Sequence, residues 1–163
     1  DGVTAIGDRA FQDGNLLSRI RLPSTVTSIG RSAFAGCRWL TAVEHAVGVE
    51  RIEAMAFSGC GRLKRIELNS CLRSLGDRSF ENCTALEEIL IPEGVEEIPE
   101  RAFFRCHSLE RVCLPSTVRR IGREAFAFCK KLQIPPVRPD VIVEERAFWG
   151  CKERNEQDED NTK

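Results

Sequence analysis

The chain has 163 residues, of which 42% are hydrophobic and 30% are charged, and its formal net charge is −1. A charge this close to zero argues against a nucleic-acid-binding protein that relies on a strongly basic surface. No apolar run approaches the roughly 18 to 20 residues that are needed to cross a bilayer. We therefore predict neither a nucleic-acid partner nor a transmembrane segment.

A phenylalanine recurs every 23 residues and sets the organisation of the chain. Self-similarity at a fixed period of about 20 to 50 residues is typical of solenoids, in which each unit buries its apolar face against its neighbours. We expect the recurring side chains to form the core. They are Phe11, Phe34, Phe57, Phe80, Phe103 and Phe126, with Phe148 following after 22 residues.

The period predicts one solenoid domain over residues 1–151 and a polar tail over residues 152–163. The units lie near residues 3–25, 26–48, 49–71, 72–94, 95–117, 118–140 and 141–151. Asp1 already lies inside a unit, so either the start was removed or the chain is a piece of something longer. The tail holds five acids, three bases and no apolar residue, which predicts a disordered segment.

Two extended patterns alternate within each unit. L-x-x-I-x-L-P, as in Leu109–Pro115, alternates with period two and ends at a proline, which predicts a short strand. V-x-x-I-G is a second extended piece, closed by a glycine turn. The intervening x-A-F-x-x-C-x-x-L is long enough only for a turn of α- or 3₁₀-helix. Stacking the units would place the L-x-x-I-x-L strands in one long parallel sheet.

Two units depart from the pattern. In the second, His45 stands where the template has Leu or Ile, and we interpret it as a partly buried core histidine. In the sixth, the strand segment reads QIPPVRPD and is one residue short. Because proline cannot donate to a ladder of strands, we expect the sheet to fray or bend at this segment.

Six of the eight cysteines stand three residues after the repeat Phe, and two do not. The six are Cys37, Cys60, Cys83, Cys106, Cys129 and Cys151. Equivalent positions form a ladder along the stack, which predicts small, buried, reduced side chains and is compatible with a reducing compartment. Cys71 and Cys113 are the thiols to test for reactivity. The chain has no Cys-x-x-Cys or Cys/His cluster, so we predict no metal site.

The sequence offers little support for catalysis. It has no Tyr and only two histidines, His45 and His107. It has no phosphate-binding loop, no G-x-S-x-G motif and no H-E-x-x-H motif. We predict a protein that is not an enzyme and that needs no cofactor.

The segments LPSTVRRIGREAFAFCKKL and LPSTVTSIGRSAFAGCRWL resemble the BspA-like (Treponema-type) leucine-rich repeat. The resemblance covers about residues 3 to 151. It implies an α/β-type, right-handed solenoid with a parallel β-sheet on its concave face and short strands or 3₁₀ turns on its convex side. Members of that family are commonly surface or adhesion proteins or interaction modules, which also allows a cell-surface location, although fold does not fix function.

The concave face is the default binding surface of a solenoid. The side chains that flank the inward residue of each strand would form a candidate partner-binding row there. The row is Arg19, Arg21, Glu44, Arg65, Glu67, Glu88 and Arg111. It mixes charges, and only its arginines resemble the anchors of binding hot spots. A docking surface for a protein and a merely solvated sheet face both stay open.

A second candidate surface is the aromatic flank, which we define as Phe104, Phe128 and Trp149. These residues follow the repeat Phe directly or by two positions in the last three units. A contiguous exposed apolar patch usually marks an interaction site. The alternative is that the three rings cap the open end of the solenoid, since terminal repeats need covering.

A third pattern is a row of alternating charge formed by Glu50, Arg73, Glu96 and Arg119. We interpret it as setting the register of the repeats through exposed ion pairs, each worth at most about 1 kcal/mol. For the whole chain we predict a scaffold that binds a protein partner through the concave row, the aromatic flank or both. The alternatives are an accessory structural subunit of a large complex and a cell-surface adhesion module.

Overall fold

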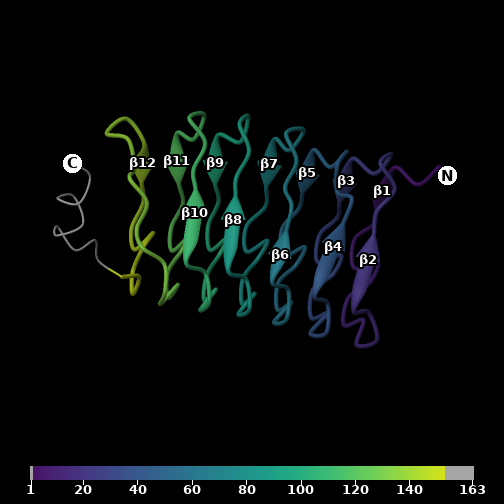
Figure 1. The fold of residues 1–163 in the computed structure, drawn as a ribbon. Coiled ribbons are helices and arrows are strands. Elements are labelled where there is room, and N and C mark those ends of the chain that lie inside the picture. Colours follow the sequence, from purple (N-terminus) through teal and green to yellow (C-terminus); the bar gives the residue numbers. More distant parts are fainter. Residues whose placement is uncertain (1, 153–163) are drawn as a thin grey trace, which may run out of the picture.

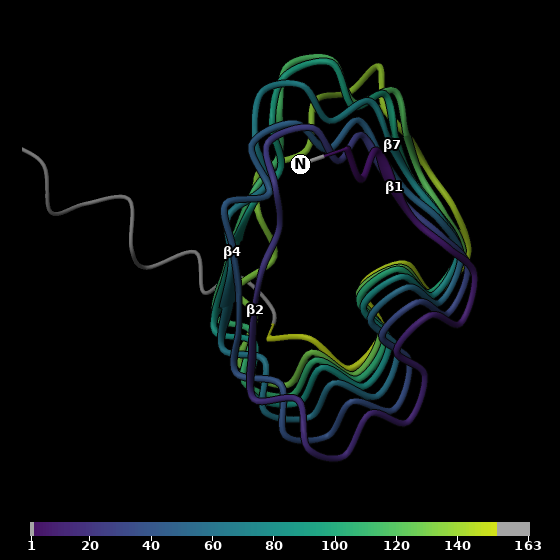
Figure 2. The same ribbon diagram turned by 90° about the vertical axis from the view of Figure 1, so that its right-hand side faces the viewer.

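The computed structural model describes residues 2–152, which wind into a solenoid of short parallel strands. Most turns contribute one strand to each of two faces, and the strands of successive turns lie side by side along the stack (Figure 1). Viewed along the stack, the turns nearly superpose, with one corner formed by the A-F-x-x-C segments (Figure 2). The predicted repeat solenoid is therefore confirmed.

The L-x-x-I-x-L segments form the first strand face. Its strands are β2 (Arg19–Arg21), β4 (Ala42–Glu44), β6 (Arg65–Ile66), β8 (Glu88–Leu90) and β10 (Arg111–Cys113). Partners are offset by one repeat, so that Ile20 pairs with Val43 and Val43 with Ile66. Because side chains alternate across a strand, these three residues point inward while their neighbours point to solvent.

The V-x-x-I-G segments form the second strand face. Its strands are β1 (Ala5–Ile6), β3 (Ser28–Ile29), β5 (Arg51–Ile52), β7 (Ser74–Leu75), β9 (Glu97–Ile98), β11 (Arg120–Ile121) and β12 (Ile142–Val143). All pairings on this face are parallel as well. The expectation of a sheet on one face only was thus too simple, because the second extended pattern pairs in the same way as the first.

The A-F-x-x-C segments form the third side, which we call the base. Residues 2–152 contain no α- or 3₁₀-helix, so the α/β description and the predicted helical turn do not apply to them. The base is a series of tight turns instead. In every unit the backbone has positive φ two residues before the repeat Phe and again two residues after it, as at Arg78 (56°) and Asn82 (58°) around Phe80. This conformation cannot continue as a helix.

The base is tied to its neighbours by backbone hydrogen bonds at alternate residues. Around Phe80, the amides of Arg78, Phe80 and Asn82 donate to carbonyls of the next turn at 2.8 to 2.9 Å. The repeat Phe rings stack above one another with centroids 5.1 to 5.3 Å apart. Five of the rings are fully buried: Phe34, Phe57, Phe80, Phe103 and Phe126.

The two ends of the phenylalanine stack differ from its centre. Phe11 is 38% exposed and Phe148 is half-buried, although both rings stack on a neighbour. The expectation of a buried core residue is therefore wrong for Phe11, because only one turn covers its ring.

Both strand faces are interrupted at the same level of the stack. β7 does not pair with β9, and β6 does not pair with β8. At the position of Pro99, neighbouring turns donate an amide to the preceding turn, as Gly76 does to Ile52 and Gly122 to Ile98, both at 2.7 Å. Proline has no N–H, so the corresponding bond to Leu75 cannot form. The base remains continuous across this level.

The sixth unit has no L-x-x-I-x-L strand. Only a single-residue bridge between Gln133 and Lys152 stands in its place, and the proline-containing segment after it forms no strand until β12. Arg138 satisfies part of the exposed backbone, since its guanidinium donates to the carbonyls of Ser116 and Val118. Residues 153–163 of the predicted disordered tail lie outside the described residues.

Candidate interaction surfaces

The predicted partner-binding row lies along the L-x-x-I-x-L face. Six of its seven side chains are exposed and Glu88 is half-buried. One pair meets within the row, where Arg111 donates to the Glu88 carboxylate at 2.9 Å. This hydrogen bond and the arginine charge lower the pKa of Glu88. The remaining members form no ion pair with another described residue.

His45 leaves the core and becomes part of this face. Its backbone has a φ of 58° and its side chain is exposed, so the interpretation as a core histidine was wrong. Ala46 is buried at this point instead, and left-handed φ is several times commoner for His than for most residues. His45 and Val47 stand between two hollows of about 420 and 460 Å³, bordered by Glu44 on one side and Arg21 on the other.

The aromatic flank is brought together on the base at the C-terminal turns. The Phe128 ring contacts Phe104 edge-on, with centroids 5.5 Å apart, and Trp149, with centroids 4.9 Å apart. Exposure rises along the cluster: Phe104 is buried, Phe128 is half-buried and Trp149 is 52% exposed. Phe104 therefore serves packing, and the accessible part of the flank is Phe128 and Trp149.

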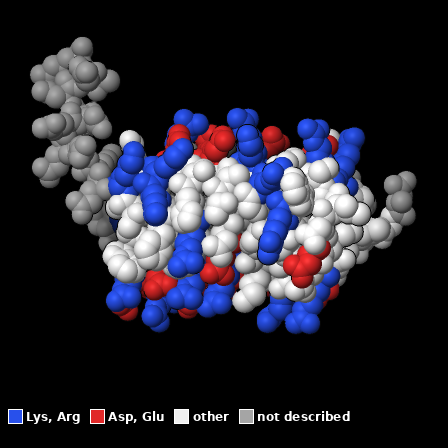
Figure 3. Space-filling view, turned by 90° about the horizontal axis from the view of Figure 1, so that it is seen from below, with Lys and Arg blue, Asp and Glu red and all other residues white. Residues whose placement is uncertain are grey.

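Cationic side chains surround this flank. The Arg105 guanidinium lies 5.1 Å from the Phe104 ring centroid and 5.8 Å from that of Phe128, and Arg146 lies 5.1 Å from Trp149. Burial and the positive charges of Lys130 and Arg105 lower the pKa of His107. Figure 3 shows the base with Lys and Arg beside uncharged surface at the end nearest the C-terminus.

A second exposed tryptophan, Trp39, lies on the base of an N-terminal turn. It is 48% exposed, and the Arg62 guanidinium covers its ring at 3.8 Å from the centroid. No other aromatic ring among the described residues stacks on it. Trp39 is thus a single ring already in contact with a cation.

The six cysteines of the ladder line the inside of the base. Each thiol donates to the carbonyl of a repeat Phe at 2.9 to 3.2 Å, as Cys106 does to Phe80. Five are fully buried and Cys151 is half-buried. Burial raises the pKa of Cys60, Cys83 and Cys106. Cys71 and Cys113, outside the ladder, are exposed.

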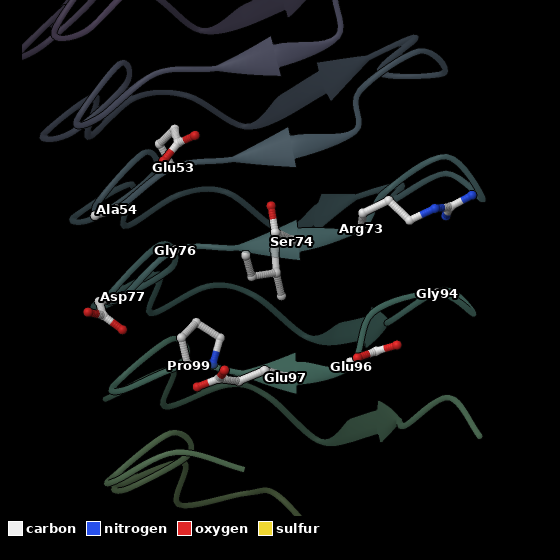
Figure 4. Close-up of a pocket in the computed structure, with 11 residues that line it drawn as sticks. Glu53, Ala54, Arg73, Ser74, Gly76, Asp77, Gly94, Glu96, Glu97 and Pro99 are labelled. Atoms are coloured by element: carbon white, nitrogen blue, oxygen red, sulfur yellow. The ribbon is translucent and has the colours of Figure 1, made fainter. Parts of the chain in front are cut away.

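Another hollow, of about 610 Å³, lies on the V-x-x-I-G face at the interrupted level (Figure 4). Glu53, Asp77, Glu96 and Glu97 border it, and Arg73 stands at one end. The repeat pattern did not predict this hollow. The available signal was Pro99 in place of the strand-ending glycine, since the missing N–H separates β7 from β9.

The charge row does not work as expected. Glu50 lies 3.9 Å from Arg51 of its own turn, and Arg73 donates to the carbonyls of Ser70 and Leu72. The row therefore forms no ion pairs between turns in residues 2–152. The pairing between turns occurs one position on, where Arg120 contacts Glu97 at 2.6 Å and Glu144 at 2.5 Å.

A sequence model described as the BspA type leucine rich repeat region matches six copies over residues 4–133. The chain belongs to the BspA-type leucine-rich-repeat family. Within residues 2–152 no group of His, Cys, Asp or Glu side chains could hold a metal ion, and no helix there could span a membrane.

Solved structures resemble this BspA-type solenoid along most of its length. A leucine-rich repeat protein from Bacteroides ovatus is 36% identical over 93% of this chain and 40% of its own, with a TM-score of 0.84. The leucine rich repeat protein of T. pallidum is 26% identical over 81% of this chain and 73% of its own, with a TM-score of 0.67. The chain therefore spans 40% of the Bacteroides ovatus protein.

A leucine rich cell surface protein from Faecalibacterium prausnitzii is 22% identical over 93% of this chain and 56% of its own, with a TM-score of 0.54. At this identity the likeness concerns the fold alone. A comparison with curated proteins finds no match.

Proposed function

We propose that this BspA-type solenoid is a non-catalytic scaffold that binds a protein partner, with the row on the L-x-x-I-x-L face as its first contact surface. One observation carries the proposal: most outward side chains of five successive strands are exposed, while the inward positions and the base supply the packing of the fold. Apart from the Arg111–Glu88 pair, the side chains of the row make no ion pair with another residue of the described part of the chain.

The row offers more than charge. Leu90 is 58% exposed and Val47 is 53% exposed, and the two hollows beside His45 make the surface of this face uneven. Partners are anchored by a few well-placed side chains, and Arg is enriched among such anchors. Arg19, Arg21 and Arg65 are the members of the row that suit this role, because none of them is paired with a described carboxylate.

The test is affinity capture from the native source with the whole chain as bait, followed by binding measurements on purified partner. Alanine at Arg19 and Arg65 should weaken binding about tenfold or more together, as expected for anchor residues. Ser74, which is exposed on the V-x-x-I-G face, supplies the control. Retained binding in the arginine variants would exclude the row as the contact surface.

A second candidate is an accessory structural subunit that docks through the aromatic flank. The observation in its favour is Trp149, which is 52% exposed although it contacts another ring. In the same binding measurement, loss of affinity in Trp149→Ala with the arginine variants unaffected would favour this candidate. Cell-surface adhesion, the remaining alternative, shares the scaffold function and differs in location.

A further inference from the structure

Trp149 and Phe128 form the exposed end of an otherwise packed aromatic cluster. Trp149 is half-exposed, and its ring is held from behind by Phe128, which is held in turn by Phe104. A large ring fixed by other rings loses little freedom when a partner covers it, and Trp is among the residues most enriched in binding hot spots. The exposed face of the Trp149 ring is thus preorganised for contact with a partner.

The backbone at Phe128 indicates that this ring is not needed for the turn. Phe128 has a φ of 61° at a position where Gly36, Gly59 and Gly150 stand in other turns. The left-handed conformation belongs to the turn itself, because Asp13, Asn82 and Arg105 adopt it at the same position. The glycines show that the turn forms without a side chain there. What Phe128 adds is a ring beside Trp149.

Two cationic side chains lie close to the exposed rings: Arg105 is beside the Phe128 ring, and Lys130 follows Phe128 by two residues. Arg105 and Lys130 are exposed, and neither forms an ion pair with another described residue. Three nearby carboxylates are engaged elsewhere, whereas Glu81 and Glu100, whose charges act on Arg101, form no ion pair with a described residue. Glu124 is bound by Arg101 at 2.6 Å, Glu110 by Lys131 at 3.1 Å and Glu145 by Arg146 at 3.4 Å.

We propose that the exposed part of the aromatic flank, with Arg105 and Lys130, binds an acidic protein segment that carries an aromatic or aliphatic anchor beside its carboxylates. The anchor covers Trp149 and Phe128, and the carboxylates meet the two unpaired cations. This inference rests on the scaffold function proposed above and names a partner chemistry for one of its surfaces. Trp39 does not offer the same site, because Arg62 already covers its single ring.

The experiment uses the full chain and three fluorescein-labelled peptides. The first is Glu-Glu-Leu-Glu-Glu-Phe-Glu-Glu, the second has Ser in place of every Glu, and the third has Lys in place of every Glu. We expect the acidic peptide to bind at least about tenfold more tightly than the other two, with an affinity that falls as salt rises. Fluorescence anisotropy at several salt concentrations measures both effects.

Variants place the binding on the flank. Trp149→Ala should weaken the acidic peptide about tenfold, and Arg105→Gln and Lys130→Gln should each weaken it about two- to fivefold and reduce its salt dependence. The matched controls lie on the other half of the base: Trp39→Ala for the exposed ring and Arg38→Ala, at the position equivalent to Lys130, for the charge. Thermal unfolding checks that each variant is folded, and the two Gln variants remove no packed ring.

Several outcomes would overturn the proposal. Equal affinity for the acidic and Ser peptides would remove the charge argument, and unchanged affinity in all three flank variants would remove the site. Tighter binding of heparin or single-stranded DNA than of the peptide would assign the surface to another polyanion. Binding seen only after residues 153–163 are deleted would make this acidic segment of the same chain the occupant. In each case a partner bound through Arg19 and Arg65 would leave the scaffold function intact.

Discussion

The base and the strand faces of this solenoid are built from the same repeat, yet only the base is continuous. In the base, the stacked rings, the hydrogen bonds from thiols to carbonyls and the backbone hydrogen bonds continue from turn to turn without interruption, including at Phe80. The strand faces break at that level on both sides. The difference shows that a solenoid can hold its turns together through one side and leave the other two free to vary.

This difference between the continuous base and the interrupted strand faces explains where the sequence departs from the repeat. His45 and Pro99 both lie on the strand faces, whereas the base keeps Ala or Ser, Phe and Cys or Gly at the same positions in every unit. Apart from Ser79 and Gly14, the base varies at its outward positions, which is where the aromatic flank lies. Residues that vary while the base stays constant are therefore the candidates for recognition.

Replacing a central ring of the base should have the largest effect. Phe80 is fully buried between two rings, so Phe80→Ala should lower the free energy of unfolding by about 3 to 5 kcal/mol through the cavity it leaves. Phe11→Ala is the matched variant at the exposed end and should cost less than half as much. Denaturant unfolding measures both. Equal costs would show that the continuous stack does not carry the stability.

The thiols distinguish the inside of the base from the faces. The unfolded, unreduced chain should show eight reactive thiols, and the folded chain at pH 8 should show two, Cys71 and Cys113. A thiol reacts as its thiolate. Burial raises the pKa of the ladder cysteines, so at pH 8 a smaller fraction of them is thiolate than of an ordinary thiol. We expect them to react at least about a hundredfold more slowly. More than two fast thiols in the folded chain would contradict the buried ladder.

The interrupted level should be visible in amide hydrogen exchange. Arg119 donates its amide to the Glu96 carbonyl at 2.8 Å, whereas the Glu96 amide has no such bond to Arg73. Both residues are exposed and occupy the same position in adjacent turns. We expect the Glu96 amide to exchange at least about tenfold faster than that of Arg119, while Phe80 on the base stays protected. Similar rates at the two positions would mean that the faces are as continuous as the base.

The architecture could be predicted from the sequence because its determinants are periodic. The recurring Phe and Cys and the period-two segments indicated a parallel solenoid, and the structure has one. The prolines of the sixth unit indicated a frayed sheet, and a single-residue bridge stands in place of a strand there. The form of the base could not be predicted in the same way. Its left-handed backbone falls on Arg, Ser, Met, Glu and Phe as well as on Gly and Asn, so residue type gave no signal for a tight turn instead of a helical one.

The candidate surfaces were less accessible to sequence reasoning, because they depend on single departures rather than on the period. Position in the template placed His45 in the core, but the backbone at that residue turns the side chain outward and buries Ala46 instead. The aromatic flank could be grouped by its spacing, whereas the burial of Phe104 depends on the Phe128 ring from the next turn. The hollow at Pro99 follows from one missing N–H, which composition and periodicity do not register.

The smallest effect tests the uniformity of the base itself. Ser79 stands where other described units have Ala, is fully buried, and its hydroxyl has no hydrogen-bond partner. A buried unpaired hydroxyl costs free energy that a methyl group does not, so Ser79→Ala should raise the free energy of unfolding by about 1 kcal/mol. Ser74→Ala, on the exposed strand β7 of the same turn, should change it by less than about 0.5 kcal/mol. A loss of stability in Ser79→Ala would mean that the hydroxyl finds a partner at the interrupted level, and that the base is specialised there too.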